Sequence, residues 1–478
     1  MSHKKDLKTC LKTLKKACSY SDWQAAAQQY DLLNGYDTWR EHDTAPYYPH
    51  RLLQEQIVNM RAHREQAEGL ALAEYLQESL HRTLGELTDS QLYSHSLLGS
   101  KILVDEYLKE VDLTLNYLCD TDFDGISKQQ KLQLFKQARL NFGRTALMLS
   151  GGGAFGIYHF GVILTLLEND LLPEIITGTS MGAIVAGVAG THSDAEIIEK
   201  FNLPEKNNFA PIALHSPRQV LNKGSIFNPV QLSECIDANI PNITFEEAFK
   251  KTGRVISITV SPSRAGQRSR LLNYKTAPNA LVSSACKASC AIPLAFPPAQ
   301  LHSKSAQGEI SSYMDSERWT DGGVSTDMPM ARIGRLFNAN HFIVSQTNPH
   351  VLPFVSNTQR KGAMSFLFDL GKSSLHAQSH QMILVAKRRI ANHQARLWMD
   401  RVDSLLGQDY LGHINLHPDF PLSRYLRVMS NPSHEEIHSY ITAGQRATWP
   451  KLSMIRNQTR ISRTLKECTQ RLKEKNNL

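Results

Sequence analysis

Two glycine-rich segments in the middle of the chain have the residue types and the spacing that acyl transfer needs. One of them, Gly178–Gly182, reads Gly-Thr-Ser-Met-Gly and has Ser180 at its centre. In this G-x-S-x-G pattern the serine occupies a sharp turn between a strand and a helix, which exposes its hydroxyl for nucleophilic attack. Gly178 and Gly182 are needed because the turn brings backbones too close together for a Cβ.

The other segment follows a short apolar stretch and contains four glycines, which are Gly151, Gly152, Gly153 and Gly156. We expect the first three to form an oxyanion hole, with backbone N–H groups facing the carbonyl oxygen that Ser180 attacks. The segment also satisfies G-x-G-x-x-G, but no carboxylate follows the second strand to bind the ribose of a dinucleotide. A turn without a ligand would leave the G-x-S-x-G element unexplained.

Strands alternate with helices around these two segments. The sequence predicts strands at 145–150, 174–177, 254–260 and 341–345, and helices at 157–168, from about 181, from 244, at 280–290 and at 330–336. This alternation is typical of an α/β fold, in which helices cover both faces of a mostly parallel sheet. The helix that begins near Met181 would direct its N-terminal N–H groups and its dipole toward the site.

The flanking regions read as helical. Apolar residues recur at three- and four-residue spacing over 52–78 and 97–118, and Ser21-Asp22 looks like a helix cap. After about residue 355 the pattern is helical again, with a long segment at 373–406 that packs on the core or lies on a lipid surface. We therefore divide the chain into a helical N-terminal domain (1–140), a catalytic domain (141–355) and a helical C-terminal region (356–478).

The charge and cysteine patterns limit the partners and the compartment. The net charge of +8 over 478 residues is concentrated in lysines and arginines at both ends, which indicates solvated helix faces or attraction to an anionic membrane. Nucleic acid is not an expected partner, because no known binding module accompanies the charge. Seven scattered cysteines, no signal peptide and no membrane-spanning run favour a cytoplasmic protein, either soluble or peripheral on a membrane or lipid-droplet surface.

We expect neither a metal nor a cofactor. Residues 120–129 resemble the start of an EF-hand loop, but its twelfth position is Lys131, where calcium needs a bidentate carboxylate. Cys286 and Cys290 form a single C-x3-C pair with no second pair, which does not fit a zinc site.

Three motifs in this order resemble the patatin-like phospholipase family: SGGGAFG, GTSMG and Asp321-Gly322-Gly323. The resemblance implies a three-layer α/β/α core and a serine–aspartate dyad that hydrolyses acyl lipids through an acyl-enzyme. Ser180 would be the nucleophile, Asp321 the base, and Gly151 to Gly153 the oxyanion hole. Gly322 and Gly323 would let the backbone turn toward the serine.

An aromatic residue, Phe155, stands where many patatins have arginine. This and the following Tyr-His-Phe-Gly are similar to the branch of fungal and plant triacylglycerol lipases. Residues 19–111 resemble the helical domain of unknown function that precedes the patatin domain in that branch. The resemblance leaves open whether the substrate is a triacylglycerol or a phospholipid.

Two alternatives stay open. A Ser-His-Asp triad would use His350 or His376, and a lipid-surface binding protein could keep the fold with little hydrolysis. A free aspartate, with a pKa near 3.9, is a poor base at neutral pH, and burial raises that pKa. We therefore expect Asp321, rather than Asp315 or Asp327, to be buried within hydrogen-bond reach of the Ser180 hydroxyl.

Overall fold

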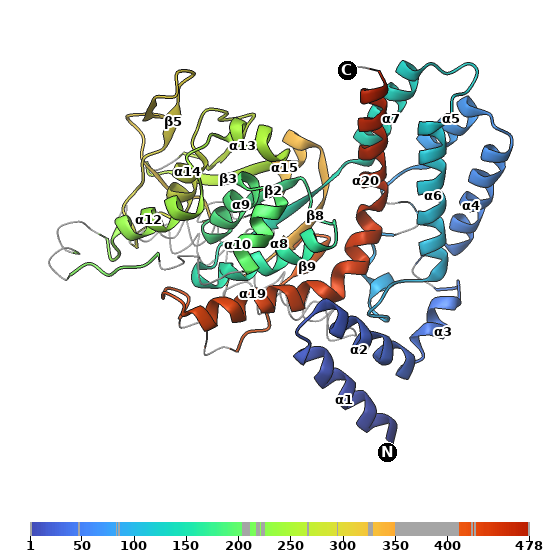
Figure 1. Cartoon of the computed structure of the whole chain (residues 1–478), viewed down its shortest axis with the longest axis horizontal. Helices are drawn as coiled ribbons and strands as arrows, with labels where there is room; N and C mark the ends of the chain where they lie inside the picture. The colour runs from blue at the N-terminus through green and yellow to red at the C-terminus, as the bar shows by residue number, and fades with distance from the viewer. Residues whose placement is uncertain are drawn as a thin grey trace, which may run out of the picture. The chain divides into compact units, whose positions relative to one another are not determined.

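A computed structural model describes residues 2–45, 48–82, 84, 87–202, 211–216, 220, 225–264, 267–293, 295–323, 328–348, 411–421, 424 and 427–476 (Figure 1). The chain divides into two units. The first contains Met1–Thr145, Arg335–His341 and Thr448–Leu478, and the second contains Ala146–Gly334 and Phe342–Ala447. The domain boundaries at 140 and 355 stay predictions, and the helix expected at 373–406 lies outside the described residues.

The first unit is built from helices. They are α1 (Ser2–Lys16), α2 (Tyr20–Leu33), α3 (Tyr36–Glu41), α4 (His50–Glu65), α5 (Gly69–Ser79), the 3₁₀ turn η2 (Ser90–Tyr93), α6 (Ile102–Asp120), α7 (Lys128–Phe142), the 3₁₀ turn η6 (Trp449–Lys451) and α20 (Leu452–Lys475). Leucines and aromatic residues from α4 to α7 form one core with Ile461, Leu465, Cys468 and Leu472 of α20. In Figure 1 the red α20 runs beside α6 and α7, so the two ends of the sequence share this core.

Local hydrogen bonds decide where these helices begin and end. Ser127 and Gln130 form a reciprocal capping box at the start of α7. The stretch 52–78 is helical as expected and forms two helices, which are separated by a turn at Ala67, whose φ is +56°. One expectation was wrong in detail. The cap of α2 is Ser19 instead of Ser21, since the Ser19 hydroxyl accepts the Asp22 N–H.

The second unit contains the sheet. Its elements are β1 (Arg144–Leu149), η3 (Gly153–Ile157), α8 (Tyr158–Glu168), β2 (Ile175–Gly178), α9 (Met181–Thr191), α10 (Asp194–Asn202), α12 (Pro229–Asn239), α13 (Phe245–Thr252), β3 (Val255–Pro262), β4 (Arg270–Leu272), α14 (Val282–Ser289), β5 (His302–Lys304), β6 (Ile310–Ser312), β7 (Trp319–Asp321), α15 (Met330–Phe337), β8 (Ala339–Ser345), β9 (Ile414–Leu416) and α19 (His434–Thr448).

The strand order is β4-β3-β2-β1-β8-β9, and β7 also pairs with β3. Strands β1, β2 and β3 are parallel, as are β8 and β9, whereas β4 and β7 run antiparallel to β3. The two crossovers from β1 to β2 and from β2 to β3 move in the same direction. Right-handed connections therefore place α8 and α9 on one face, where they contact each other. The predicted α/β architecture with a mostly parallel sheet is confirmed.

In the segment that resembles an EF-hand loop, the acidic side chain at the first position pairs with basic side chains of the protein itself. The Lys131 ammonium donates to the Thr121 carbonyl, and Asp120 pairs with Arg471 and Lys475. Within the described ranges there is no cluster of three or more His, Cys, Asp or Glu side chains arranged to hold a metal ion. No helix in the described part of the chain is both long enough and apolar enough to cross a bilayer.

Arg82 is a buried cross-link of the helical unit. Its guanidinium donates to the carbonyls of Phe142 (3.1 Å), Gly143 (3.1 Å) and Gln458 (3.2 Å) and lies over the Phe142 ring. Arg82→Leu should lower the free energy of unfolding by about 2–4 kcal/mol, because buried carbonyls would lose their donors. Urea unfolding measures this change. Lys136→Gln, at an exposed position of α7, should change it by less than about 0.5 kcal/mol, and equal values for the two variants would contradict this role.

Candidate active site

Ser180 occupies a strained turn between β2 and α9. Its φ is +54° and its ψ is −125°, a region that residues with a Cβ rarely adopt and that costs about 1–3 kcal/mol. The turn is as tight as the G-x-S-x-G pattern predicts. A Cβ on Gly178 would lie 2.0 Å from the Gly182 oxygen, and one on Gly182 would lie 2.4 Å from the Leu149 oxygen. No larger residue fits at either position.

One row of the sheet places the three motifs together. Gly178 of β2 pairs with Leu149 of β1 on one side and with Ile258 of β3 on the other. Two residues beyond this row, β1 reaches Gly151 and β2 reaches Ser180. A Cβ on Gly151 would lie 3.3 Å from the Ser180 Cβ. The glycine loop and the serine therefore leave neighbouring strands at the same level.

Asp321 reaches this level from the opposite direction. Val260, two residues beyond Ile258, pairs with Arg270 of β4 and with Asp321 of β7. Since β4 lies on the side of β3 away from β2, β7 occupies the row that β2 vacates after Gly178. The C-terminal ends of β2 and β7 thus point at each other. Asp321 is 5% exposed and Ser180 is 7% exposed, so the expected burial of the aspartate is observed.

Ser289, at the end of α14, holds the serine turn against the sheet. Its hydroxyl accepts the Ser180 N–H (3.0 Å) and donates to the Thr259 carbonyl of β3 (2.8 Å). Two residues further on, the Ala291 carbonyl accepts the Asp321 N–H (3.0 Å). The end of α14 therefore fixes the backbone at both predicted dyad residues.

A buried histidine fixes the start of the glycine loop through hydrogen bonds. The carbonyl of Ser150 can only accept, so Nε2 of His159 carries the proton and donates to it (3.0 Å), while Nδ1 accepts from the Ser345 hydroxyl (2.7 Å). Burial lowers the pKa of His159 to about 4, which keeps the ring neutral. The Thr347 hydroxyl donates to the Gly151 carbonyl (2.8 Å). These bonds fix the loop where it leaves β1.

The loop keeps two of its N–H groups available. Within the described chain, nothing accepts the N–H groups of Gly152 and Gly153, whereas that of Ala154 donates to the Val428 carbonyl (2.9 Å). Val428 belongs to residues 427–432, a strap that covers the loop. Asn431 ties this strap to Ile212, whose N–H it accepts (2.9 Å) and whose carbonyl its amide contacts (2.7 Å).

An apolar pocket opens beside Ser180. Its apolar walls come from the turns and helices around the site and from the strap, and they include Ile157, Ile184, Leu232, Ile292, Phe296 and Met429. A pocket with a mostly apolar lining suits a hydrocarbon group.

Cys290 lies in this pocket next to the serine. It lines the pocket together with Ser180. Burial, followed by the nearby charges of other groups including Asp321, raises the pKa of Cys290 well above its usual range. It is therefore a neutral thiol with both predicted dyad residues near it.

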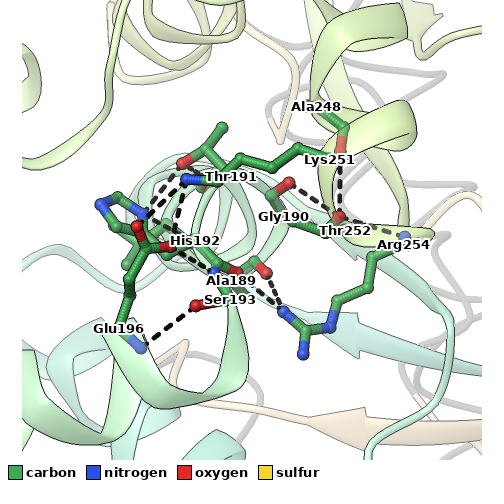
Figure 2. A network of polar contacts seen from close by, with 12 residues as sticks. Ala189, Gly190, Thr191, His192, Ser193, Glu196, Ala248, Lys251, Thr252 and Arg254 are labelled. Carbon is green, nitrogen blue, oxygen red and sulfur yellow. Dashed lines mark hydrogen bonds and ion pairs between the residues drawn. The ribbon is translucent and has the colours of Figure 1, made fainter.

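The far end of α9 is fixed by a separate network, shown in Figure 2. The guanidinium of Arg254, just before β3, donates to the carbonyls of Ala189 (2.7 Å) and His192 (3.0 Å) at the end of the helix. The Thr252 hydroxyl donates to the Gly190 carbonyl (3.1 Å). Because α9 begins directly after Ser180, these bonds also fix the position of the serine turn.

The other predicted site residues lie where their motifs place them. Gly156 is in η3, where a Cβ would lie 2.4 Å from the Met181 side chain, and Gly322 follows β7 against the Thr259 backbone. The N–H of Gly323 donates to the Asp321 carboxylate (2.7 Å). Asp315 is exposed, whereas Asp327, His350 and His376 lie outside the described residues.

Sequence reasoning missed the supporting residues. In the sequence, His159 belongs to the Tyr-His-Phe-Gly segment after Phe155, but no role was predicted for it. Cys290 was considered only as a zinc ligand, which its spacing does not fit. Ser289 had two signals, its place in the helix predicted at 280–290 and in a segment that resembles the patatin-like family before the aspartate motif. No signal in the sequence indicated the strap at 427–432. The roles of Ser180, Asp321 and the glycine loop stay predictions.

Comparisons with known proteins extend along the chain. Residues 1–140 match the family model of a domain of unknown function (DUF3336), and residues 147–332 match that of the patatin-like phospholipases. Triacylglycerol lipase ptl3 of Schizosaccharomyces pombe is 32% identical over 93% of this chain and 94% of its own length. Triacylglycerol lipase 4 of Saccharomyces cerevisiae is 34% identical over 92% of this chain, which spans 50% of that relative.

Triacylglycerol lipase SDP1L of Arabidopsis thaliana is 32% identical over 95% of this chain and 57% of its own length. The crystal structure of VipD from Legionella pneumophila aligns with 63% of this chain and 67% of VipD at 14% identity, but its TM-score of 0.27 is too low to carry an argument. The α/β fold and these relatives place the chain in a class of proteins related to triacylglycerol lipases. Within that class, the chain belongs to the patatin-like phospholipase family and carries the helical DUF3336 domain in front.

The strain at Ser180 gives a test that is independent of activity. Glycine adopts a positive φ without a Cβ clash, so Ser180→Gly should be more stable than Ser180→Ala by about 1 kcal/mol. Thermal unfolding of the two variants measures the difference. The control is Ala183→Gly within α9, which should be destabilising, since glycine weakens a helix interior by about 1 kcal/mol. Equal unfolding midpoints for the two Ser180 variants would refute strain at this turn.

His159 should act as a positioning residue with a distinct pH signature. An unfolded histidine has a pKa near 6.5 and takes up a proton between pH 6.5 and 4, whereas native His159 does not. The wild type should therefore lose about 3 kcal/mol of stability over this window as the pH falls, and His159→Gln should lack this loss. Urea unfolding at several pH values measures it.

Activity gives a second measurement on the same residue. His159→Phe should lower kcat at least about tenfold with little change in KM, because the loop loses its support but not its pocket. His159→Gln keeps a donor and should restore most of kcat. A kcat of His159→Phe equal to that of the wild type would overturn the positioning role.

Proposed function

We propose that this protein hydrolyses the ester bonds of acyl lipids through an acyl-enzyme on Ser180, with triacylglycerol as its substrate. The observation that carries the proposal is the sheet register, which brings the glycine loop, Ser180 and Asp321 to one level beside an apolar pocket. The names of the matched relatives support the substrate class. The chain spans 50% of the length of triacylglycerol lipase 4 and 57% of the length of SDP1L.

In this mechanism the apolar pocket takes the acyl chain and places the ester carbonyl next to Ser180. Asp321 accepts the hydroxyl proton as the serine oxygen attacks. The N–H groups of Gly151 to Gly153 stabilise the negative oxygen of the tetrahedral intermediate. The alcohol leaves with that proton, and water then releases the fatty acid by the same steps. The substrate lies in a membrane or lipid-droplet surface, so the protein works as a peripheral enzyme, which we expect in the cytoplasm.

The test is fatty-acid release from a triacylglycerol emulsion and from phospholipid vesicles by the wild type, Ser180→Ala and Asp321→Asn. Each substitution should lower kcat by at least about a thousandfold, because each removes an essential step of acyl transfer. Ser283→Ala, on the buried helix α14 but outside the site, is the matched control and should retain activity. If Ser180→Ala released fatty acid as fast as the wild type, Ser180 would not be the nucleophile. The substrate that the wild type hydrolyses faster, triacylglycerol or phospholipid, decides between a lipase and a phospholipase.

A further inference from the structure

The first helix of the chain has one apolar side, and that side is already occupied. Leu7, Cys10 and Leu14 lie on one side of α1, which packs on α2, and the thiol of Cys10 donates to the Ala26 carbonyl of α2 (3.0 Å). Cys10 and Leu14 are buried. In Figure 1 α1 and α2, both dark blue, lie side by side. The opposite side of α1 therefore faces away from its own partner helix.

The rest of the helix surface has a cationic side. At 3.6 residues per turn, Lys4, Lys8 and Lys15 fall within a narrow stripe of α1, and Leu11 borders this stripe on the side of the apolar residues. Lys5, Lys12 and Lys16 follow on the other flank of the stripe, and all six lysines are exposed. The acidic residue of α1, Asp6, lies across the helix from Lys15. Leu11 is 45% exposed at the edge of the lysines.

The cations at the other end of the chain have a different environment. In α20, Arg460 pairs with Asp112, while Arg471 and Lys475 both pair with Asp120. In the described part of the chain, no ion pair is found for Lys4, Lys5, Lys8, Lys12 or Lys15. The two basic ends look alike in the sequence, but three cations of α20 pair with carboxylates of α6, whereas no such pair is found for these five lysines of α1 in the described chain.

We propose that the cationic stripe of α1 binds the anionic headgroups of a lipid surface, with Leu11 inserted between them. Lysines act as flexible point charges toward phosphates, and each one near an anionic bilayer raises partitioning about fivefold. An exposed leucine at the edge of a basic helix face suits the interface between headgroups and acyl chains. Nucleic acid fits less well, because α1 contains no arginine to read bases or clamp phosphates.

This inference deepens the proposed function and rests on it, because it identifies what would hold the enzyme on the surface that contains its substrate. The two remain separable. Binding to vesicles depends on α1, whereas hydrolysis of a soluble short-chain ester depends on the Ser180 site alone. A failure of one therefore leaves the other measurable.

The experiment is vesicle co-sedimentation of the full chain, with phosphatidylcholine vesicles that contain or lack phosphatidylserine. The test variant combines Lys4→Gln, Lys8→Gln and Lys15→Gln. The control variant combines Lys128→Gln, Lys136→Gln and Lys473→Gln, which changes the net charge equally on other helices of the same unit. Both variants are first compared with the wild type by thermal unfolding, so that a folding defect is recognised.

The test variant should bind vesicles with phosphatidylserine at least about tenfold more weakly than the wild type, and the control variant less than about twofold more weakly. Raised salt should weaken the wild type toward the test variant, because these charges are exposed. Leu11→Gln should weaken binding by an amount that salt does not change. Both lysine variants should hydrolyse a soluble ester at the wild-type rate.

Equal binding of the test and control variants would overturn the proposal. So would a test variant that binds these vesicles like the wild type but loses affinity for a DNA duplex, since the stripe would then serve nucleic acid. If no variant and not even the wild type hydrolysed the soluble ester, the proposed function would fail, while the vesicle data would still decide the role of α1.

Discussion

The site depends on one steric constraint, which is the approach of three main chains just beyond one row of the sheet. Leu149, Gly178 and Ile258 pair side by side, and the chain turns sharply after Gly178 because the Gly182 backbone lies against the Leu149 oxygen. This turn gives Ser180 its positive φ. A serine in that conformation cannot relax without moving α9, and α9 is fixed at its other end by Arg254. The strain is therefore maintained by the fold.

Elements from four separate parts of the chain meet around that turn. The end of α14 bonds the Ser180 backbone through Ser289, β7 brings Asp321 into the row that β2 vacates, and His159 supports the loop after β1. The strap at 427–432 covers the same loop and lines the pocket. The side chains that line the pocket carry no charge, which suits a reaction that must exclude water from the developing charge.

The sequence was a good guide to features with local causes. Strands β1, β2, β3 and β8 and helices α8, α9, α13, α14 and α15 were predicted from periodicity, and the capping box at Thr244 and Glu247 begins α13 where expected. Helices α10 and α12 and the short strands β4 to β7 were not predicted. The G-x-S-x-G element identified the sharp turn, in which Gly178 lies against the Gly182 backbone four residues later. The turn at Ala67 was not predicted, although Gly69 follows it and begins α5.

Features that depend on distant contacts were out of reach. His159 differs from any other helical histidine only through Ser150 and Ser345, and Cys290 only through Ser180. The same limit applies to charge. A count of lysines and arginines gives equal weight to both ends of the chain, because pairing is invisible in a composition.

The structure shows that the charges at these two ends have different environments. Arg460 and Arg471 each pair with a carboxylate on α6, whereas the lysines of α1 lie away from the apolar side that packs on α2. A cationic face costs stability through self-repulsion, since like charges at helical spacing repel. A protein that gained nothing from this face would lose little by replacing a lysine with glutamate, which would pair with its neighbours. The six lysines of α1 and its single acidic residue are therefore better explained by an external anionic surface than by folding.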